Sequence, residues 1–147
     1  MATDRAAVVH EIERLIHELT WRDRRQFARQ VSEYNLSALQ YLALHEIDHL
    51  APDVTMGAVG EVIQVPPSSM TNIVDKLVAA GLVTRGTTPN DRRAVVVNLT
   101  SAGSDLIRNV ESLREDRLRA ALKDESDHDL NELARFLAHL LKGMDEH

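Results

Sequence analysis

Apolar positions in the middle of the chain recur every three or four residues on both sides of a proline-containing break. The first run is Met56, Val59, Val62 and Ile63, and the second is Met70, Ile73, Val74 and Leu77. Pro67 suits the first position of a helix, where its missing N–H costs nothing, and Ala80-Gly81 supplies a stop signal. The pattern therefore predicts a helix-turn-helix whose second helix spans about residues 67–80.

Two β-branched runs follow, at residues 82–85 and 94–99, and an eight-residue segment of turn formers and arginines separates them. This order predicts a β-hairpin with a cationic tip. Two adjacent arginines at such a tip, Arg92 and Arg93, can reach DNA phosphates or a narrow minor groove. Asp91 is close enough in sequence to orient Arg93.

The face of the second helix opposite its apolar stripe carries short or hydrogen-bonding side chains. These are Ser68, Ser69, Thr71, Asn72, Asp75 and Lys76. A solvated face needs nothing more specific. A face that enters the DNA major groove needs the same residue types, because base edges are read by hydrogen bonds and small apolar contacts.

Long amphipathic segments flank this region. Residues 6–34 read as one long helix or two collinear ones, Thr100 or Ser101 can cap a second long helix, and Ser126 with Asp129 forms a variant capping box that opens a final helix. The apolar stripes of the two C-terminal helices exceed what a small domain covers. They predict a homodimer with entwined terminal helices, although packing within one chain is the alternative.

Composition narrows the possible functions. A chain of 147 residues with 44% hydrophobic content fits one domain. The absence of cysteine excludes disulfides, thiolate metal sites and cysteine-based redox sensing. No apolar run reaches membrane length, so we expect a cytoplasmic protein with no membrane partner. The net charge is −6, but residues 60–100 hold four basic and three acidic residues, which makes this segment the positive one.

Two further groups of side chains have alternative explanations. Arg22, Arg24, Arg25 and Arg29 crowd the later half of the first helix, either as a solvated face with acidic partners such as Asp23 and Glu33 or as a contact for phosphates or an acidic effector. Trp21, Tyr34 and Tyr41 either belong to the core or line an effector pocket.

The residues His45-Glu46-Ile47-Asp48-His49 match H-E-x-x-H, which on a helix supplies two zinc ligands and a general base. This stretch is the basis of the alternative function, a zinc-dependent metallopeptidase with Glu61 as a possible third ligand. Pro52 follows too soon for a longer helix, and we see too little β-structure for a substrate cleft. Solvated histidines are the default, with a non-catalytic metal at His45 and His49 as the weaker option. We predict no cofactor and no enzyme.

The central segment resembles the MarR family of winged helix-turn-helix transcriptional regulators. The resemblance rests on Val59-Gly60-Glu61-Val62, Met70-Thr71-Asn72-Ile73-Val74-Asp75-Lys76-Leu77, Ala80-Gly81-Leu82-Val83, Asp91-Arg92-Arg93 and Val97-Asn98-Leu99-Thr100-Ser101-Ala102-Gly103. Leu36 to Leu44 looks like the family's second helix, and 53–55 like a short strand against the wing. Two positions depart from the pattern: Gln64 stands where a turn glycine is usual, and Pro66 where a serine or aspartate caps the recognition helix.

The resemblance implies a mainly α single domain over residues 1–147. Residues 36–100 would form the winged helix-turn-helix lobe with its hairpin wing, and residues 1–35 and 101–147 the dimerisation helices. The implied function is a homodimeric, sequence-specific DNA-binding regulator, more in the manner of a repressor than an activator, which a small-molecule effector releases from an inverted-repeat operator.

Site residues follow from the same resemblance. Pro67, Ser68, Ser69, Thr71 and Asn72 are expected to lie nearest the bases, Lys76 toward phosphate, and Arg92 and Arg93 at the minor groove. A third hypothesis, a helical dimerisation module without a nucleic-acid function, predicts indifference to DNA.

Overall fold

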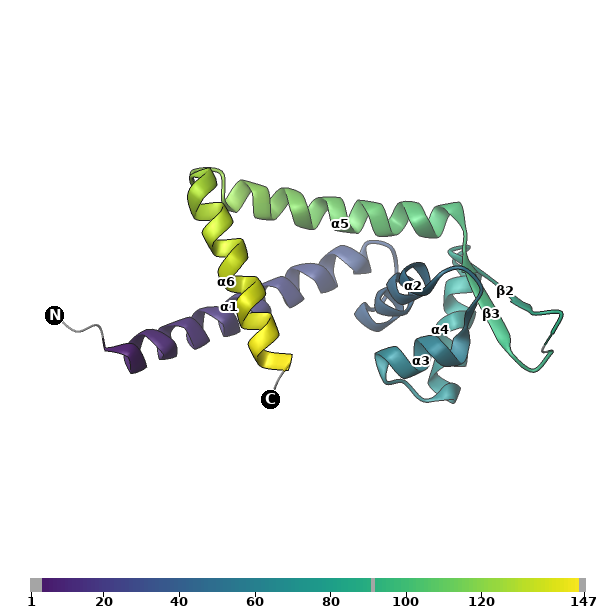
Figure 1. Ribbon diagram of the computed structural model, residues 1–147. Helices are drawn as coiled ribbons and strands as arrows, with labels where there is room; N and C mark the ends of the chain where they lie inside the picture. The colour runs from purple at the N-terminus through teal and green to yellow at the C-terminus, as the bar shows by residue number, and fades with distance from the viewer. Residues whose placement is uncertain (1–3, 91, 146–147) are drawn as a thin grey trace. The chain divides into compact units, whose positions relative to one another are not determined.

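Nine elements follow one another along the chain in the computed structural model, which describes residues 4–90 and 92–145 (Figure 1). They are α1 (Arg5–Ser32), α2 (Ala38–Leu50), β1 (Val54–Thr55), α3 (Met56–Ile63), α4 (Pro67–Ala79), β2 (Val83–Thr87), β3 (Val95–Leu99), α5 (Ser101–Ala121) and α6 (Asp127–Asp145). The mainly α winged helix-turn-helix fold predicted from the sequence is confirmed. Contacts divide the chain into a first unit that ends at Val110 and a second that begins at Glu111.

The start of each long helix is fixed by a local side chain. Asp4 accepts the N–H of Ala6 at the start of α1. Ser37 and Gln40 form a reciprocal capping box at α2, which the sequence analysis did not identify. Residues 6–34 are thus mostly one helix, because nothing between its cap and Ser32 interrupts the backbone ladder.

Helices α1, α3 and α4 end with the same backbone motif, each with one residue in the left-handed region. These residues are Asn35 (φ 57°), Gln64 (φ 57°) and Gly81 (φ 73°). At α4, the N–H of Leu82 donates to the carbonyl of Leu77 (3.0 Å), and the N–H of Gly81 to that of Val78 (2.9 Å). This paired arrangement satisfies carbonyls that a helix end leaves open.

Gln64 adopts in the turn the conformation that favours the glycine usual at this position. A left-handed residue with a Cβ costs about 1 kcal/mol, part of which glycine forfeits through its freer unfolded chain. We therefore expect Gln64→Gly to raise the free energy of unfolding by about 0.5 kcal/mol. Urea unfolding at unchanged m-value measures this, Gln64→Ala should not reproduce the gain, and a lower midpoint for the glycine variant would contradict it.

The three strands pair antiparallel in the order β1-β3-β2. Val54 lies opposite Val97, so the short strand implied by the resemblance is confirmed. Each strand begins one residue later than the predicted runs of 82–85 and 94–99. The larger difference is at the tip, where Gly86 and Thr87 pair with Val96 and Val95 and extend β2 by two residues. The hairpin projects past α4 (Figure 1).

The core lies in the first unit, between α2, α3, α4, the sheet and the ends of α1 and α5. Its largest fully buried side chains are Leu44, Ile47, Met70, Leu77, Val31, Val59, Val74, Val97 and Val110. The apolar stripe predicted for 67–80 is the stripe that α4 buries, which fixes the opposite face of this helix toward solvent.

In the second unit, Ser126 accepts the N–H of Asp129 (3.1 Å) and caps α6, as predicted. No residue of α6 within 127–145 is buried in the protomer, although leucines recur along one face of this helix. Within residues 4–90 and 92–145, the helices lack the combination of length and apolar character that crossing a bilayer requires.

Candidate nucleic-acid interface

The exposed face of α4 is the first half of the candidate site. Met70, Ile73, Val74 and Leu77 anchor the helix in the core, and this leaves the opposite face to solvent. The exposed residues are Pro67, Ser68, Thr71, Asn72, Asp75 and Lys76, which we call the reading face. Ser69, predicted to lie with them, is half-buried and therefore less accessible than its neighbours.

Two local features determine which hydrogen-bonding groups the reading face presents. Pro66 precedes α4 without a side-chain cap, and its carbonyl accepts the N–H of Met70 (3.0 Å). The Thr71 hydroxyl donates to the carbonyl of Pro67 (3.1 Å). With its proton so placed, Thr71 presents an accepting oxygen and a methyl group outward, which suit a base amino group and a thymine methyl respectively.

Asp75 forms an ion pair with Arg85 of β2, a contact that the sequence analysis missed. Ten residues separate the partners, so no helical spacing signals the pair. Both side chains remain about half exposed, which limits the contribution to stability to between 0 and about 1 kcal/mol. Its electrostatic effect is more important, because Arg85 offsets a carboxylate that would otherwise repel phosphates from the reading face.

The hairpin tip is the second half of the site. Arg92 and Arg93 are both exposed, consistent with the expectation that they lie at an extremity. Asp91, predicted to orient Arg93, lies outside the described residues. The wing is therefore a pair of hydrogen-bonded strands whose connecting segment carries two exposed cationic side chains.

Thr100 joins the root of this wing to α4 and α5. Its hydroxyl donates to the carbonyl of Gly81 (2.7 Å) and accepts the N–H of Gly103 (3.1 Å), while its own N–H donates to the carbonyl of Leu82 (3.0 Å). The predicted cap of α5 is thus confirmed at Thr100. One residue therefore bonds to the segment after α4, to the segment before β2 and to the start of α5.

The H-E-x-x-H stretch lies on α2 as the spacing predicts, but the structure does not complete a metal site around it. His45 packs near Tyr41 (6.2 Å between ring centroids), and its Nδ1 lies 3.7 Å from the Glu46 carboxylate. Across residues 4–90 and 92–145, no three His, Cys, Asp or Glu side chains are grouped to hold a metal ion. A catalytic zinc needs three protein ligands, so the geometry gives the metallopeptidase no support.

The three aromatic residues predicted to line an effector pocket have different surroundings. Tyr41 is 5% exposed and meets Phe27 edge to face at 5.0 Å, and Tyr34 packs partly buried against the same core. Trp21 is 59% exposed. Two of the three therefore belong to the core, and an effector pocket formed by all three stays a prediction.

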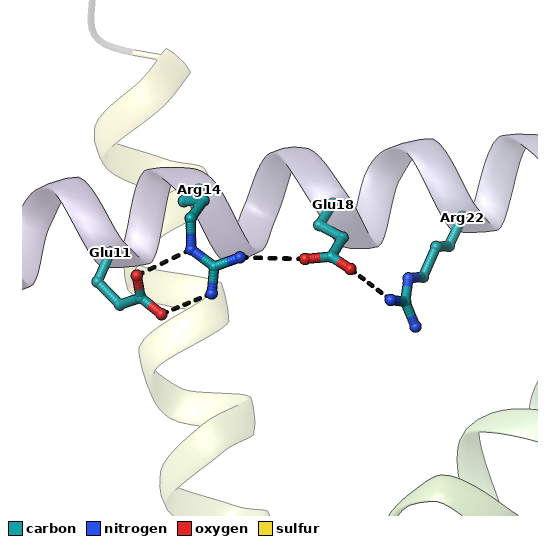
Figure 2. Close-up of polar contacts among 4 residues, drawn as sticks. All are labelled: Glu11, Arg14, Glu18 and Arg22. Atoms are coloured by element: carbon teal, nitrogen blue, oxygen red, sulfur yellow. Dashed lines mark hydrogen bonds and ion pairs between the residues drawn. The ribbon is translucent and has the colours of Figure 1, made fainter.

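A ladder of charges runs along α1 (Figure 2). Arg14 donates to Glu11 (2.7 and 2.9 Å) and to Glu18 (3.2 Å), and Arg22 pairs with Glu18 in turn. The hydrogen bonds from Arg14 lower the pKa of the Glu11 carboxyl below its ordinary value. The acidic partner of Arg22 is Glu18, not one of the two predicted examples, Asp23 and Glu33.

Comparison with known proteins agrees with this geometry. A model of the MarR family matches residues 34–94, which span α2, the helix-turn-helix and most of the wing. A MarR family protein from Bacillus stearothermophilus superposes with a TM-score of 0.82 at 24% identity and covers 97% of this chain and 99% of its own.

Two further structures extend the comparison. A single-residue mutant of MarR from E. coli is 28% identical, with a TM-score of 0.72 and coverage of 88% of this chain and 95% of its own. A mutant of MepR from S. aureus, bound to an oligodeoxyribonucleotide, is 15% identical, with a TM-score of 0.71 over 90% of this chain and 97% of its own.

Proposed function

This chain belongs to the MarR family of winged helix-turn-helix regulators, and from that premise we propose that it is a homodimeric, sequence-specific DNA-binding transcriptional regulator. The observation that carries the proposal is the reading face of α4, which stays exposed beside a hairpin tipped by Arg92 and Arg93. A helix whose apolar stripe is fully anchored can present its polar face to a major groove without rearrangement.

Each side chain of the site has a role in this proposal. Ser68, Thr71 and Asn72 contact base edges, since hydroxyl and amide groups read donors and acceptors in the major groove. Ser69 and Pro67 contribute at the rim, and Lys76 contacts phosphate. The N-terminus of α4 has no side-chain cap, and the positive end of its helix dipole would favour a nearby phosphate.

The wing would supply the contacts outside the major groove. Arg92 and Arg93 reach the flanking minor groove or its phosphates, where a narrow groove concentrates negative potential. The reading face and wing together hold few cations, so one copy binds weakly. Two linked copies raise the apparent affinity through their effective concentration.

The terminal helices support the dimer. Large apolar side chains stay exposed in the protomer along α1, including Val9, Ile12, Leu15, Ile16 and Leu19, and along α6, including Leu133, Phe136, Leu137, Leu140 and Leu141. Patches of this kind mark surfaces that a partner covers. A two-fold dimer would bind an inverted repeat with half-sites about 10 bp apart.

A repressor is favoured over an activator, acting in the cytoplasm on double-stranded DNA. The proposed dimer would have two conformations, one with its recognition helices spaced for DNA and one without. A small-molecule effector would release the operator by binding the second conformation more tightly, since a ligand shifts an equilibrium only through differential affinity.

Salt-titrated binding to DNA selected from a random duplex pool tests the proposal. We expect steep salt dependence for the native chain. Replacing Arg92 and Arg93 with alanine should lower affinity and reduce the slope of log K against log salt by about 2 to 4 per dimer, because each lost phosphate contact changes it by about 0.9 and each substitution occurs twice.

Arg108 and Arg119 provide the matched control. Both are exposed on α5 and paired within their own helix, to Asp105 and Glu115. Their replacement by alanine removes the same charge but should leave the slope nearly unchanged. A native chain that selects no sequence, or that binds the same whether or not the wing arginines are present, would favour the helical dimerisation module. Chelator should have no effect on binding.

A further inference from the structure

Two glutamines are the buried polar residues of the described chain, and their amides serve different purposes. Gln40 is local, because its side-chain oxygen accepts the N–H of Ser37 (2.9 Å) in the capping box of α2. Gln30 reaches across the fold. Its Nε2 donates to the carbonyl oxygen of Val110 (3.1 Å), which is 80 residues away on α5. A buried amide is costly unless it is bonded, so this contact has a defined geometry.

Gln30 lies where α1 and α5 both enter the core of the first unit. The buried residues of α1 are Gln30 and Val31, at its C-terminal end. The buried residues of α5 are Gly103, Leu106, Ile107 and Val110, and residues 111–121 are all exposed. The same two helices carry exposed apolar side chains beyond this point, so the bond joins them at the edge of the core.

A hydrogen bond adds here what apolar contact cannot. Val31 and Val110 are both buried in the same core, but the hydrophobic effect has no direction and tolerates rotation or sliding of a helix. The Val110 carbonyl has two lone pairs, one of which serves its own helix, so the second accepts Gln30 only in a narrow range of orientations. The amide therefore fixes how α5 lies against the end of α1.

We propose that Gln30 is a positioning residue: by holding the Val110 carbonyl it fixes the orientation of α5 against the end of α1. In the dimer of the proposed function, α5 connects each reading face to the terminal helices. Gln30 thereby sets the spacing of the two recognition helices, and so the operator spacing that the dimer accepts. The second half of this inference rests on the proposed function, and the first half does not.

The first measurement needs no DNA. The chain has no cysteine, so Ser68→Cys and Asp116→Cys create the two labelling sites, one on α4 and one on α5 beyond the joint. Doubly spin-labelled chain, diluted in excess unlabelled chain, reports the distance between them in dipolar spectroscopy. We expect a broadened or shifted distribution for Gln30→Met, which keeps the side-chain length but loses the donor.

Gln40→Met is the matched control, since it also removes a buried glutamine hydrogen bond. Both variants should lower the melting temperature by similar amounts, and circular dichroism would establish that each is folded. Gln40→Met should leave the distance distribution unchanged, because its bond is confined to the start of α2.

The second measurement uses the DNA selected by the native chain, with the centre of the inverted repeat lengthened or shortened by single base pairs. Gln30→Met should lose about tenfold in discrimination between the preferred and altered spacings, as much as one buried hydrogen bond can supply, and Gln40→Met should keep the native profile. If the native chain selects no DNA but Gln30→Met still broadens the distance distribution, the proposed function fails. The positioning of α5 by Gln30 is then still supported. An unchanged distance distribution with an unchanged spacing profile would overturn the inference.

Discussion

Replacing Gly103 with alanine is expected to lower the free energy of unfolding by about 3 kcal/mol or more, the largest effect of any single methyl group we foresee in this chain. A Cβ at this position would lie 2.2 Å from the carbonyl oxygen of Leu82 and 3.1 Å from a methyl of Leu99. The first of these is backbone, which cannot move aside as a flexible side chain can. Urea or thermal unfolding of the purified variant measures the loss.

The clash has consequences beyond packing. The Leu82 carbonyl also accepts the N–H of Thr100. Moving α5 or the segment before β2 to relieve the clash would therefore break this hydrogen bond. Gly57 provides the control, because a Cβ there meets nothing within 4 Å. Gly57→Ala should be neutral or stabilise by up to about 1 kcal/mol, as expected in a helix. A Gly103→Ala variant as stable as the native chain would show that α5 can shift without cost.

Leu137→Glu is expected to convert the proposed dimer to monomers and to reduce affinity for the selected DNA by at least about a hundredfold, through loss of the linked second copy. Leu137 is 49% exposed in the protomer, so a charge there costs the isolated fold little. In a two-fold interface the same charge is buried twice, at several kcal/mol each. Sedimentation equilibrium and DNA titration measure the two losses.

His139 supplies the comparison on the same helix. It is exposed and lies away from the leucine stripe of α6, so His139→Glu adds a similar charge without entering the proposed interface. It should leave both the assembly and the DNA affinity unchanged. Leu137→Glu that still forms dimers of native strength would require an interface that does not use α6.

Local signals explain why much of this molecule could be read from its sequence. The apolar period predicted α4 at 67–80, and the helix spans Pro67–Ala79, because helical periodicity and capping depend on neighbours within four residues. The same holds for the hairpin and the cap at Ser126. Where the local signal was weak, as at Gly86 and Thr87, the strand boundary was wrong, since pairing with β3 decided it.

Contacts between distant residues could not be read in this way. Three such contacts depend on how elements pack, and no sequence periodicity predicts them. They are the Asp75–Arg85 ion pair, the Gln30–Val110 hydrogen bond and the approach of Leu82 to Gly103. Gly103 is instructive, because the sequence resemblance included it without giving a reason. The structure supplies the reason: the carbonyl oxygen of Leu82 occupies the space that a Cβ at position 103 would need.

The sequence by itself determined the helices, the hairpin, the polar residues of the reading face and the arginines of the wing, because these follow from short-range periodicity and residue chemistry. Tertiary structure alone decided that Asp75 is neutralised by Arg85, that Ser69 is half-buried, and that a buried amide of α1 bonds to the backbone of α5. The physical reason is range: side-chain patterning acts over one or two turns, whereas burial and directional bonds across the core exist only after the elements have packed.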